Sequence, residues 1–149
     1  MTNMGSFKST VSITVIVILV LYKFLNLRRE LILLTYVVIS TILLNHLLKS
    51  LFQRERPTIH RIIEVSGYSY PSGHSMAAFS LYGVLAFLIW RHLHTRFSRG
   101  LMIVIASLII LAIGISRIYL GVHYPTDIIG GYLMSVCWLT ALIWIYQRF

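Results

Sequence analysis

The sequence is 149 residues long, with 58% hydrophobic residues, only 11% charged residues and a formal net charge of +9 at pH 7. Together with a mean hydropathy of +0.82, these values lie outside the range of soluble globular domains and predict a membrane protein. Nucleic acid is excluded as a partner, because the basic residues lie in short polar segments between apolar stretches rather than in a separate basic domain. Most of them are expected to hold helix ends at the lipid headgroups.

Five apolar stretches have the length of about 20 residues that crosses a hydrocarbon core. They cover approximately residues 10–27, 31–48, 74–91, 100–116 and 126–146. The first begins like a signal peptide, but no small-residue cleavage site follows it, so we interpret it as a retained helix. With no repeat or soluble linker, the sequence predicts one all-α transmembrane bundle, a single domain over residues 1–149. The single cysteine, Cys137, is expected to be buried in the last span.

The end of the second span carries two cations, Lys49 and Arg56, in the stretch KSLFQRERP. Their separation of seven residues is two helical turns, so both side chains are expected on one side, with Pro57 turning the chain outward. Two cations on one face repel each other unless an anion lies between them. A basic helix end before a proline also occurs for purely structural reasons, and this stretch alone does not distinguish the two interpretations.

The stretch YPSGHS, residues 70–75, stands directly before the third span. Pro71 and Gly73 favour a tight turn, and Ser72 or a neighbour caps a helix whose first N–H groups lie at a positive dipole end. Such a terminus binds phosphate, and Ser72 adds a hydroxyl donor. His74, which titrates near neutral pH, could give a proton to a leaving oxygen. An ordinary capped helix with an interfacial histidine is the alternative.

The stretch RIYLGVHYPTD, residues 117–127, joins the fourth and fifth spans. Arg117 ends the fourth span, and Pro125 suits the first turn of the fifth helix. Asp127 follows His123 by four residues, so its carboxylate can accept the Nδ1–H of the imidazole, fix the tautomer and leave Nε2 as a nucleophile. Asp127 is also the only aspartate in the chain, and an ionisable residue at the edge of a span is costly unless it is paired.

An antiparallel bundle would bring these three stretches together. The second and fourth spans end at them, whereas the third and fifth begin at them, so all three are expected on one membrane face. Cationic heads, a helix N-terminus and two histidines, one of them with its carboxylate, would then converge on an anion site the size of a phosphate.

In this order and spacing, the residues resemble the complete three-part signature of the type 2 phosphatidic acid phosphatase superfamily. The resemblance covers about residues 31–146, and no motif position departs from the pattern. The matching positions are Lys49, Arg56 and Pro57, then Pro71, Ser72, Gly73 and His74, then Ser116, Arg117, His123 and Asp127.

The resemblance implies a reaction and a role for each residue. His123 would attack phosphorus and form a phosphohistidine, Asp127 would orient it, and His74 would protonate the leaving group. The phosphoryl oxygens would be held, without a metal or another cofactor, by Lys49, Arg56, Ser72, Gly73 and Arg117. Independently of the family, fixed cations and N–H donors suit the charge on a transferring phosphoryl group, and the chain has only four carboxylate side chains from which to build a metal cluster.

A site at the membrane interface suits a phosphate whose tail stays in the bilayer. Family members act on phosphatidic acid, phosphatidylglycerol phosphate and undecaprenyl diphosphate, and neither the resemblance nor the loop of residues 58–70 separates these substrates. A small membrane transporter or channel is one alternative, but it should hold its charges near the bilayer midplane rather than at helix ends. A catalytically inactive member of the same fold is another, against which the intact His74, His123 and Asp127 argue.

The charges at the two membrane faces predict the orientation. The face of the three motifs carries Lys8, Arg54 and Arg61, once the cations assigned to the phosphate, Lys49, Arg56 and Arg117, are set aside. The opposite face carries seven basic residues, which are Lys23, Arg28, Arg29, Arg91, Arg96, Arg99 and Arg148. The positive-inside rule therefore places the site outside the cytoplasm. Five helices would leave the N-terminus outside, whereas the family usually has six, so we expect that the first helix of the family pattern is missing from this chain.

Overall fold

The computed structural model describes residues 28–58 and 62–148. Within these residues it contains four helices and no strand, in the order α2 (Arg28–Phe52), α3 (Gly73–Trp90), α4 (Arg96–Tyr119) and α5 (Pro125–Arg148). All four are long and apolar enough to cross a membrane. The all-α transmembrane bundle is therefore confirmed, while the span expected at residues 10–27 lies outside the described residues.

The helix boundaries follow the capping signals more closely than the apolar stretches. α3 and α5 begin and end within two residues of the predicted spans, and α5 starts at Pro125 as its N-terminal preference predicts. α4 starts earlier than predicted because Thr95 caps it, its hydroxyl accepting the Ser98 N–H at 3.1 Å. α2 also exceeds its apolar stretch, and Lys49 lies in its last turn.

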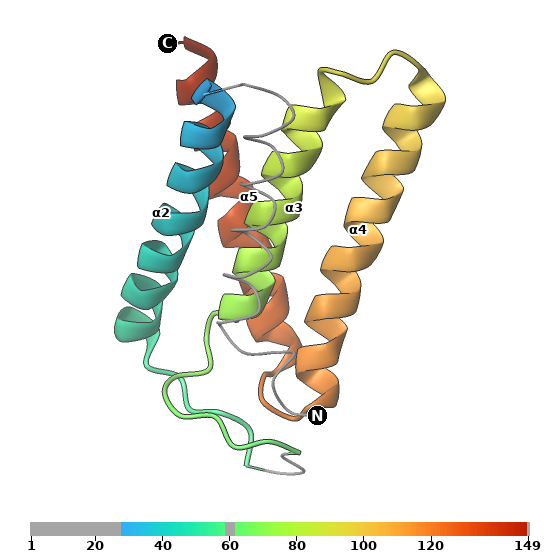
Figure 1. The fold of residues 1–149 in the computed structure, drawn as a ribbon. Helices are drawn as coiled ribbons and strands as arrows, with labels where there is room; N and C mark the ends of the chain where they lie inside the picture. The colour runs from blue at the N-terminus through green and yellow to red at the C-terminus, as the bar shows by residue number, and fades with distance from the viewer. Residues whose placement is uncertain (1–27, 59–61, 149) are drawn as a thin grey trace.

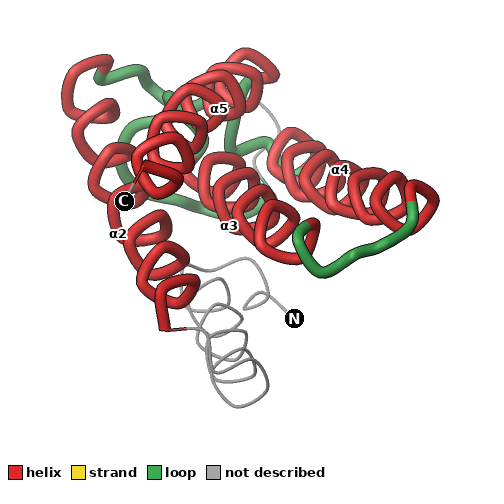
Figure 2. Tube along the Cα trace, turned by 90° about the horizontal axis from the view of Figure 1, so that it is seen from above, coloured by secondary structure: helices red, strands yellow, loops and turns green. Residues whose placement is uncertain are grey.

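The helices run side by side, and α3 is the central one (Figures 1 and 2). It packs against α2, α4 and α5, and α2 also contacts α5. In Figure 1 the α2–α3 and α4–α5 connections lie at the same end of the bundle, while the α3–α4 connection and the end of α5 lie at the other. The antiparallel order that the three motifs require is thus present.

The apolar core lies between α2, α3 and α5, nearer the end that carries the α3–α4 connection. Its buried members are Leu33, Leu34, Val37, Leu81, Val84, Leu88, Leu139 and Leu142. Towards the other end the interior becomes polar, and its side chains bond across helices. The Trp138 Nε1–H donates to Ser40 at 3.0 Å, and the Ser135 hydroxyl donates to the Met76 carbonyl at 3.3 Å.

Cys137 is exposed on the outer surface of α5, so the prediction that it is buried was wrong. A transmembrane helix presents apolar residues on its lipid face as well as on its packed face, and a thiol is apolar enough for either. The hydropathy of the span therefore did not indicate which face Cys137 occupies.

Candidate active site

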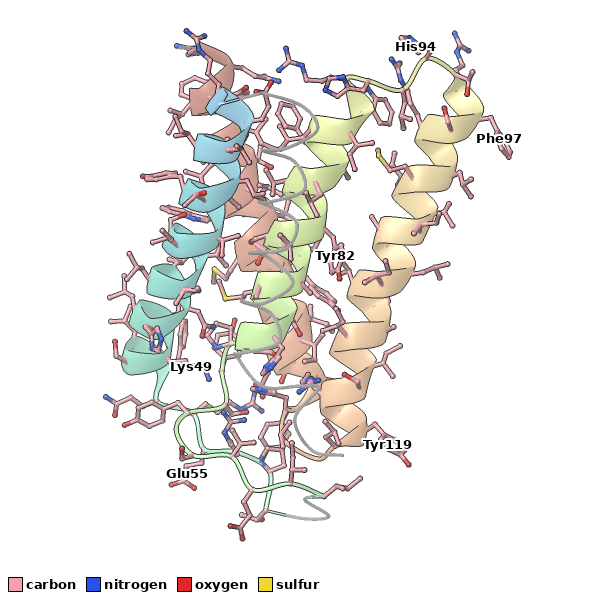
Figure 3. All side chains as sticks on the ribbon, viewed as in Figure 1. Lys49, Glu55, Tyr82, His94, Phe97 and Tyr119 are labelled. Carbon is pink, nitrogen blue, oxygen red and sulfur yellow. The ribbon has the colours of Figure 1, made fainter. Side chains whose placement is uncertain are left out.

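The three motifs lie together at one end of the bundle, where α2 and α4 finish and α3 and α5 begin (Figure 1). Figure 3 places Lys49, Glu55 and Tyr119 at this end, with His94 and Phe97 at the opposite end. The α2–α3 loop is tied to the α4–α5 turn, for example through the Ile62 N–H, which donates to the Leu120 carbonyl at 3.2 Å. The shared membrane face predicted from the sequence is confirmed.

The spacing of Arg56 from Lys49 predicted that both residues project from one helix, but α2 does not extend to Arg56. The helix ends at Phe52, and Gln53 takes a left-handed φ of 45°, which turns the chain before Arg56. Only the helical spacing by which Lys49 and Arg56 were expected to share one side was therefore wrong. The loop instead carries Arg56 back toward His123, and the charges of both Arg56 and Lys49 act on that imidazole.

The side chains of Arg56 and Lys49 organise the loop around them. Arg56 is only 8% exposed, and its guanidinium donates to the carbonyls of Gly67 at 2.9 Å and of Val122 at 3.0 Å. The ammonium of Lys49 donates to the Tyr68 carbonyl at 2.6 Å. Two cations are thus held at fixed positions by backbone oxygens, as a preorganised anion site requires.

His123 and Asp127 are both buried and face each other. His123 lies in the turn before α5 and Asp127 in its first turn. The Nδ1 atom of His123 is 3.4 Å from Oδ2 of Asp127, within ion-pair distance but longer than a well-formed hydrogen bond. On the other side of the ring, Nε2 is 3.4 Å from Nη1 of Arg56. A proton on Nδ1 leaves the Nε2 lone pair facing the cation, which is the tautomer that a nucleophilic imidazole needs.

Its surroundings keep the His123 imidazole neutral. Burial, followed by the charges of Arg56 and Lys49, lowers the pKa of His123 from 6.5 to about 4, while Asp127 opposes this shift. The desolvation and the two cations together outweigh the carboxylate. At neutral pH His123 is therefore unprotonated at one nitrogen and able to attack an electrophile.

Ser72 is the N-cap of α3, as the sequence predicts. Its hydroxyl oxygen accepts the Ser75 N–H at 3.4 Å and the Ser75 hydroxyl at 3.0 Å, so its own O–H can still donate to an anion. The Ser72 N–H donates to the Asp127 carbonyl at 3.1 Å, which fixes the start of α3 against α5. Gly131 allows this approach, because a Cβ there would lie 3.2 Å from the Ser72 carbonyl oxygen.

Gly73 is required by its contact with α2. A Cβ at this position would lie 2.9 Å from Oδ1 of Asn45. The buried Asn45 amide donates to the Pro71 carbonyl at 3.2 Å and lies 3.2 Å from the Met76 sulfur, so it holds the turn on both sides of Gly73. Asn45 was missed by the sequence reasoning; its only signal is its place one turn before Lys49 on the same helix face.

His74 and Arg117 complete the predicted set at the same end. His74 lies in the first turn of α3 and Arg117 in the last turn of α4, and both are half-buried. The Arg117 Nε–H donates to the Ser116 hydroxyl at 3.2 Å, and its carbonyl accepts the Val122 N–H at 3.3 Å. Direct contacts join Arg56, His123 and Asp127, and the ends of α3 and α4 bring His74 and Arg117 to the same end of the bundle.

Two loop residues that the motif analysis missed bind the Asp127 carboxylate. Nη1 of Arg54 donates to Oδ1 at 2.9 Å, and the Ser69 hydroxyl donates to Oδ2. The Tyr124 N–H also donates to Oδ2, at 2.9 Å. In the sequence Arg54 is only one more cation in the QRERP stretch, and Ser69 carries no signal. Both carboxylate oxygens are thus held, and Asp127 cannot rotate freely.

The described part of the chain, residues 28–58 and 62–148, contains no group of three or more His, Cys, Asp or Glu side chains that could hold a metal ion. The charged groups that converge at the motif end of the bundle are cations around one histidine–carboxylate pair.

The fold and this end of the bundle define an integral membrane protein with a buried histidine–carboxylate pair and fixed cations at one membrane face. The chain belongs to the PAP2 superfamily, whose sequence profile matches residues 29–149. The family resemblance carried by the three motifs is therefore confirmed.

Individual relatives are similar over part of their length. Phosphatidylglycerophosphatase B of Bacillus subtilis (strain 168) is 41% identical over 95 residues, which are 63% of this chain and 47% of that protein. YbjG of Escherichia coli (strain K12), named as an inferred undecaprenyl-diphosphatase, is 36% identical over 115 residues, 66% of this chain and 52% of that protein. The chain spans about half the length of these curated relatives.

The similarity to a solved structure extends over nearly the whole chain. The crystal structure of a transmembrane PAP2 type phosphatidylglycerolphosphate phosphatase from Bacillus subtilis matches with a TM-score of 0.87 at 30% sequence identity. The match covers 99% of this chain and 73% of that one.

Proposed function

We propose that this protein is a metal-independent lipid phosphate phosphatase that works through a phosphohistidine. The observation that carries the proposal is the buried His123, with Asp127 against Nδ1 and Arg56 against Nε2. The names of its relatives, phosphatidylglycerophosphatase and inferred undecaprenyl-diphosphatase, support the same reaction class.

In the proposed reaction, Nε2 of His123 attacks phosphorus and the bond from phosphorus to the leaving oxygen breaks. His74 gives its proton to that oxygen, and the product alcohol or phosphate departs. His74, now neutral, takes a proton from water, whose oxygen attacks the phosphohistidine and releases inorganic phosphate with the His123 lone pair restored. Asp127 holds the Nδ1 proton throughout and stabilises the positive charge on the ring.

The phosphoryl oxygens are assigned to Lys49, Arg56, Ser72, the Gly73 backbone and Arg117. Cations in fixed positions can neutralise the negative charge that spreads over the equatorial oxygens. In metal-dependent phosphoryl-transfer enzymes a metal ion neutralises this charge. We therefore expect activity to persist in excess EDTA and to be inhibited by vanadate, which adopts the trigonal bipyramidal shape of the transferring group. A strict requirement for added Mg²⁺ would contradict this assignment.

The substrate class follows from the position of the site at the end of membrane-spanning helices. We propose a phosphate or diphosphate with a lipid tail: phosphatidylglycerol phosphate, phosphatidic acid or undecaprenyl diphosphate. The test is phosphate release by the purified protein in detergent from each of these three lipids, with the soluble p-nitrophenyl phosphate for comparison and the His123→Ala protein as a blank. No release from any lipid above this blank would contradict the proposal and favour an inactive member of the family.

We further propose that the site faces away from the cytoplasm. Basic residues at the opposite end, among them Arg29, Arg91 and Arg96, support this orientation through the positive-inside rule. An outward site would suit a polyprenyl diphosphate that is released on the outer leaflet.

The orientation can be tested with a membrane-impermeant maleimide on intact cells. Single cysteines would be placed at Ser66, which is exposed in the α2–α3 loop, and at His94, which is exposed at the other end, in a Cys137→Ser background. Thr95 is avoided because it caps α4. Labelling at position 66 and not at 94 is expected, and the reverse pattern would overturn the orientation.

A further inference from the structure

Arg54 lies outside the three-part signature, yet its side chain binds the Asp127 carboxylate and two neighbouring residues. Its Nη1 donates to Oδ1 of Asp127 at 2.9 Å and to the Thr126 hydroxyl at 2.7 Å. Its guanidinium carbon also lies 4.2 Å from the centroid of the Tyr124 ring. One side chain of the α2–α3 loop thus contacts three residues at the start of α5, 70 or more positions along the chain.

The backbone of Arg54 acts on the second carboxylate oxygen. Its carbonyl accepts the Ser69 N–H at 2.7 Å, and the Ser69 hydroxyl donates to Oδ2 of Asp127. Oδ2 is also the oxygen that faces Nδ1 of His123. Arg54 therefore fixes one oxygen directly and helps to place the donor for the other.

Arg54 also brings a positive charge to the Asp127 carboxylate. Asp127 is fully buried, whereas the Arg54 side chain is 40% exposed, so the pair joins a buried anion to a partly solvated cation. A buried carboxylate without a cation would strongly favour a protonated imidazole beside it. A protonated His123 has no lone pair with which to attack phosphorus.

We propose that Arg54 is a positioning residue of the phosphoryl transfer: it locks the Asp127 carboxylate against Nδ1 of His123, so that the imidazole keeps the tautomer and orientation that direct Nε2 at the substrate, and it balances the charge of the carboxylate. The role rests on the proposed phosphatase function, but the electrostatic link from Arg54 through Asp127 to His123 does not need substrate. The other charges acting on His123 are Lys49 at the end of α2 and Arg56 in the loop. α3 and α4 bring His74 and Arg117 to the same end.

Two measurements test the proposal on Arg54→Gln and Arg54→Lys. The first is steady-state kinetics on a lipid phosphate: Arg54→Gln should lower kcat about 10-fold with KM changed by less than about threefold, because a positioning residue acts on the transition state. Arg54→Lys should recover part of kcat. The second is the titration of the His123 ring by NMR in ¹³C-histidine-labelled protein without substrate. Its midpoint should rise by about one pH unit in Arg54→Gln, because the Asp127 charge is no longer balanced.

Arg99→Gln is the matched control. Arg99 also lies over an aromatic ring, that of Trp90 at 5.0 Å, and donates to the Leu93 carbonyl at 3.0 Å, but at the opposite end of the bundle. It should leave both readouts unchanged. A rise in KM with an unchanged titration would show that Arg54 binds the phosphate itself, and no change in either readout would assign it to the loop structure alone; both results overturn the proposal. If the phosphatase function fails, the titration still decides whether Arg54 controls His123.

Discussion

Both ends of the bundle are rich in positive charge, but they hold it in different ways. At the end with the α3–α4 connection, the arginines make short-range contacts: Arg99 with Leu93 and Trp90, and Arg148 with Trp144. At the motif end, Arg54 and Arg56 bind groups more than 60 residues away along the chain. Positive charge alone therefore does not distinguish the candidate site; the difference is that its cations are fixed by distant parts of the chain around a buried histidine.

The largest effect is expected at His123, in comparison with a histidine at the opposite end of the bundle. His123→Ala should lower turnover by about 10³-fold or more, because it removes the proposed nucleophile. His94→Ala, at the exposed opposite end, should leave turnover unchanged. Phosphate release from a lipid substrate in detergent measures both. Full activity in His123→Ala would contradict the proposed mechanism.

Asp127→Asn separates orientation from attack in the same assay. The amide can still contact the ring but favours a poorer tautomer, so a small residual rate above that of His123→Ala is expected.

The second prediction concerns the pH dependence of the site. Because the pKa of His123 is lowered to about 4, its NMR signal should titrate near that value, and activity should be lost as the pH falls through it. In the unfolded chain the same ring takes up its proton near pH 6.5. Between these two pH values the unfolded state binds more protons, so His123 makes the folded state less stable as the pH falls. A midpoint near 6.5 in the folded protein would show that burial and the two cations do not control this ring.

The third prediction is a smaller loss from the tether between α2 and the start of α3. Asn45→Ala removes a buried hydrogen bond to Pro71, which costs about 1–3 kcal/mol, and it frees the turn that carries Ser72 and Gly73. We expect a lower Tm and a loss of about 3- to 10-fold in kcat/KM. Ser50→Ala is the control, since Ser50 is exposed near the end of the same helix and its hydroxyl donates to the local Leu47 carbonyl at 2.7 Å. A loss of stability with unchanged kcat/KM would show that Asn45 only packs.

The sequence predicted those parts of the site that depend on helix ends. Ser72 as the cap of α3 and Pro125 in the first turn of α5 are local signals, and the alternation of span directions places the motifs on one face. Arg56 was misplaced because a non-glycine residue, Gln53, takes a left-handed conformation that no local pattern indicates. Asn45 and Ser69 were missed because their partners are 26 and 58 residues away.

The smallest effect is expected from a cation of the opposite end. Arg96 and Arg117 stand at the two ends of α4, about 30 Å apart at ~1.5 Å per residue. Physiological salt screens exposed charges beyond about 8 Å, so the exposed Arg96 cannot act on a phosphate held near Arg117. Arg96→Gln should therefore change kcat/KM by less than about twofold and Tm only slightly, since surface charges contribute little to stability. A tenfold loss of kcat/KM with an unchanged Tm would mean that the two ends communicate, and the contrast between them would then describe their contacts and not their roles.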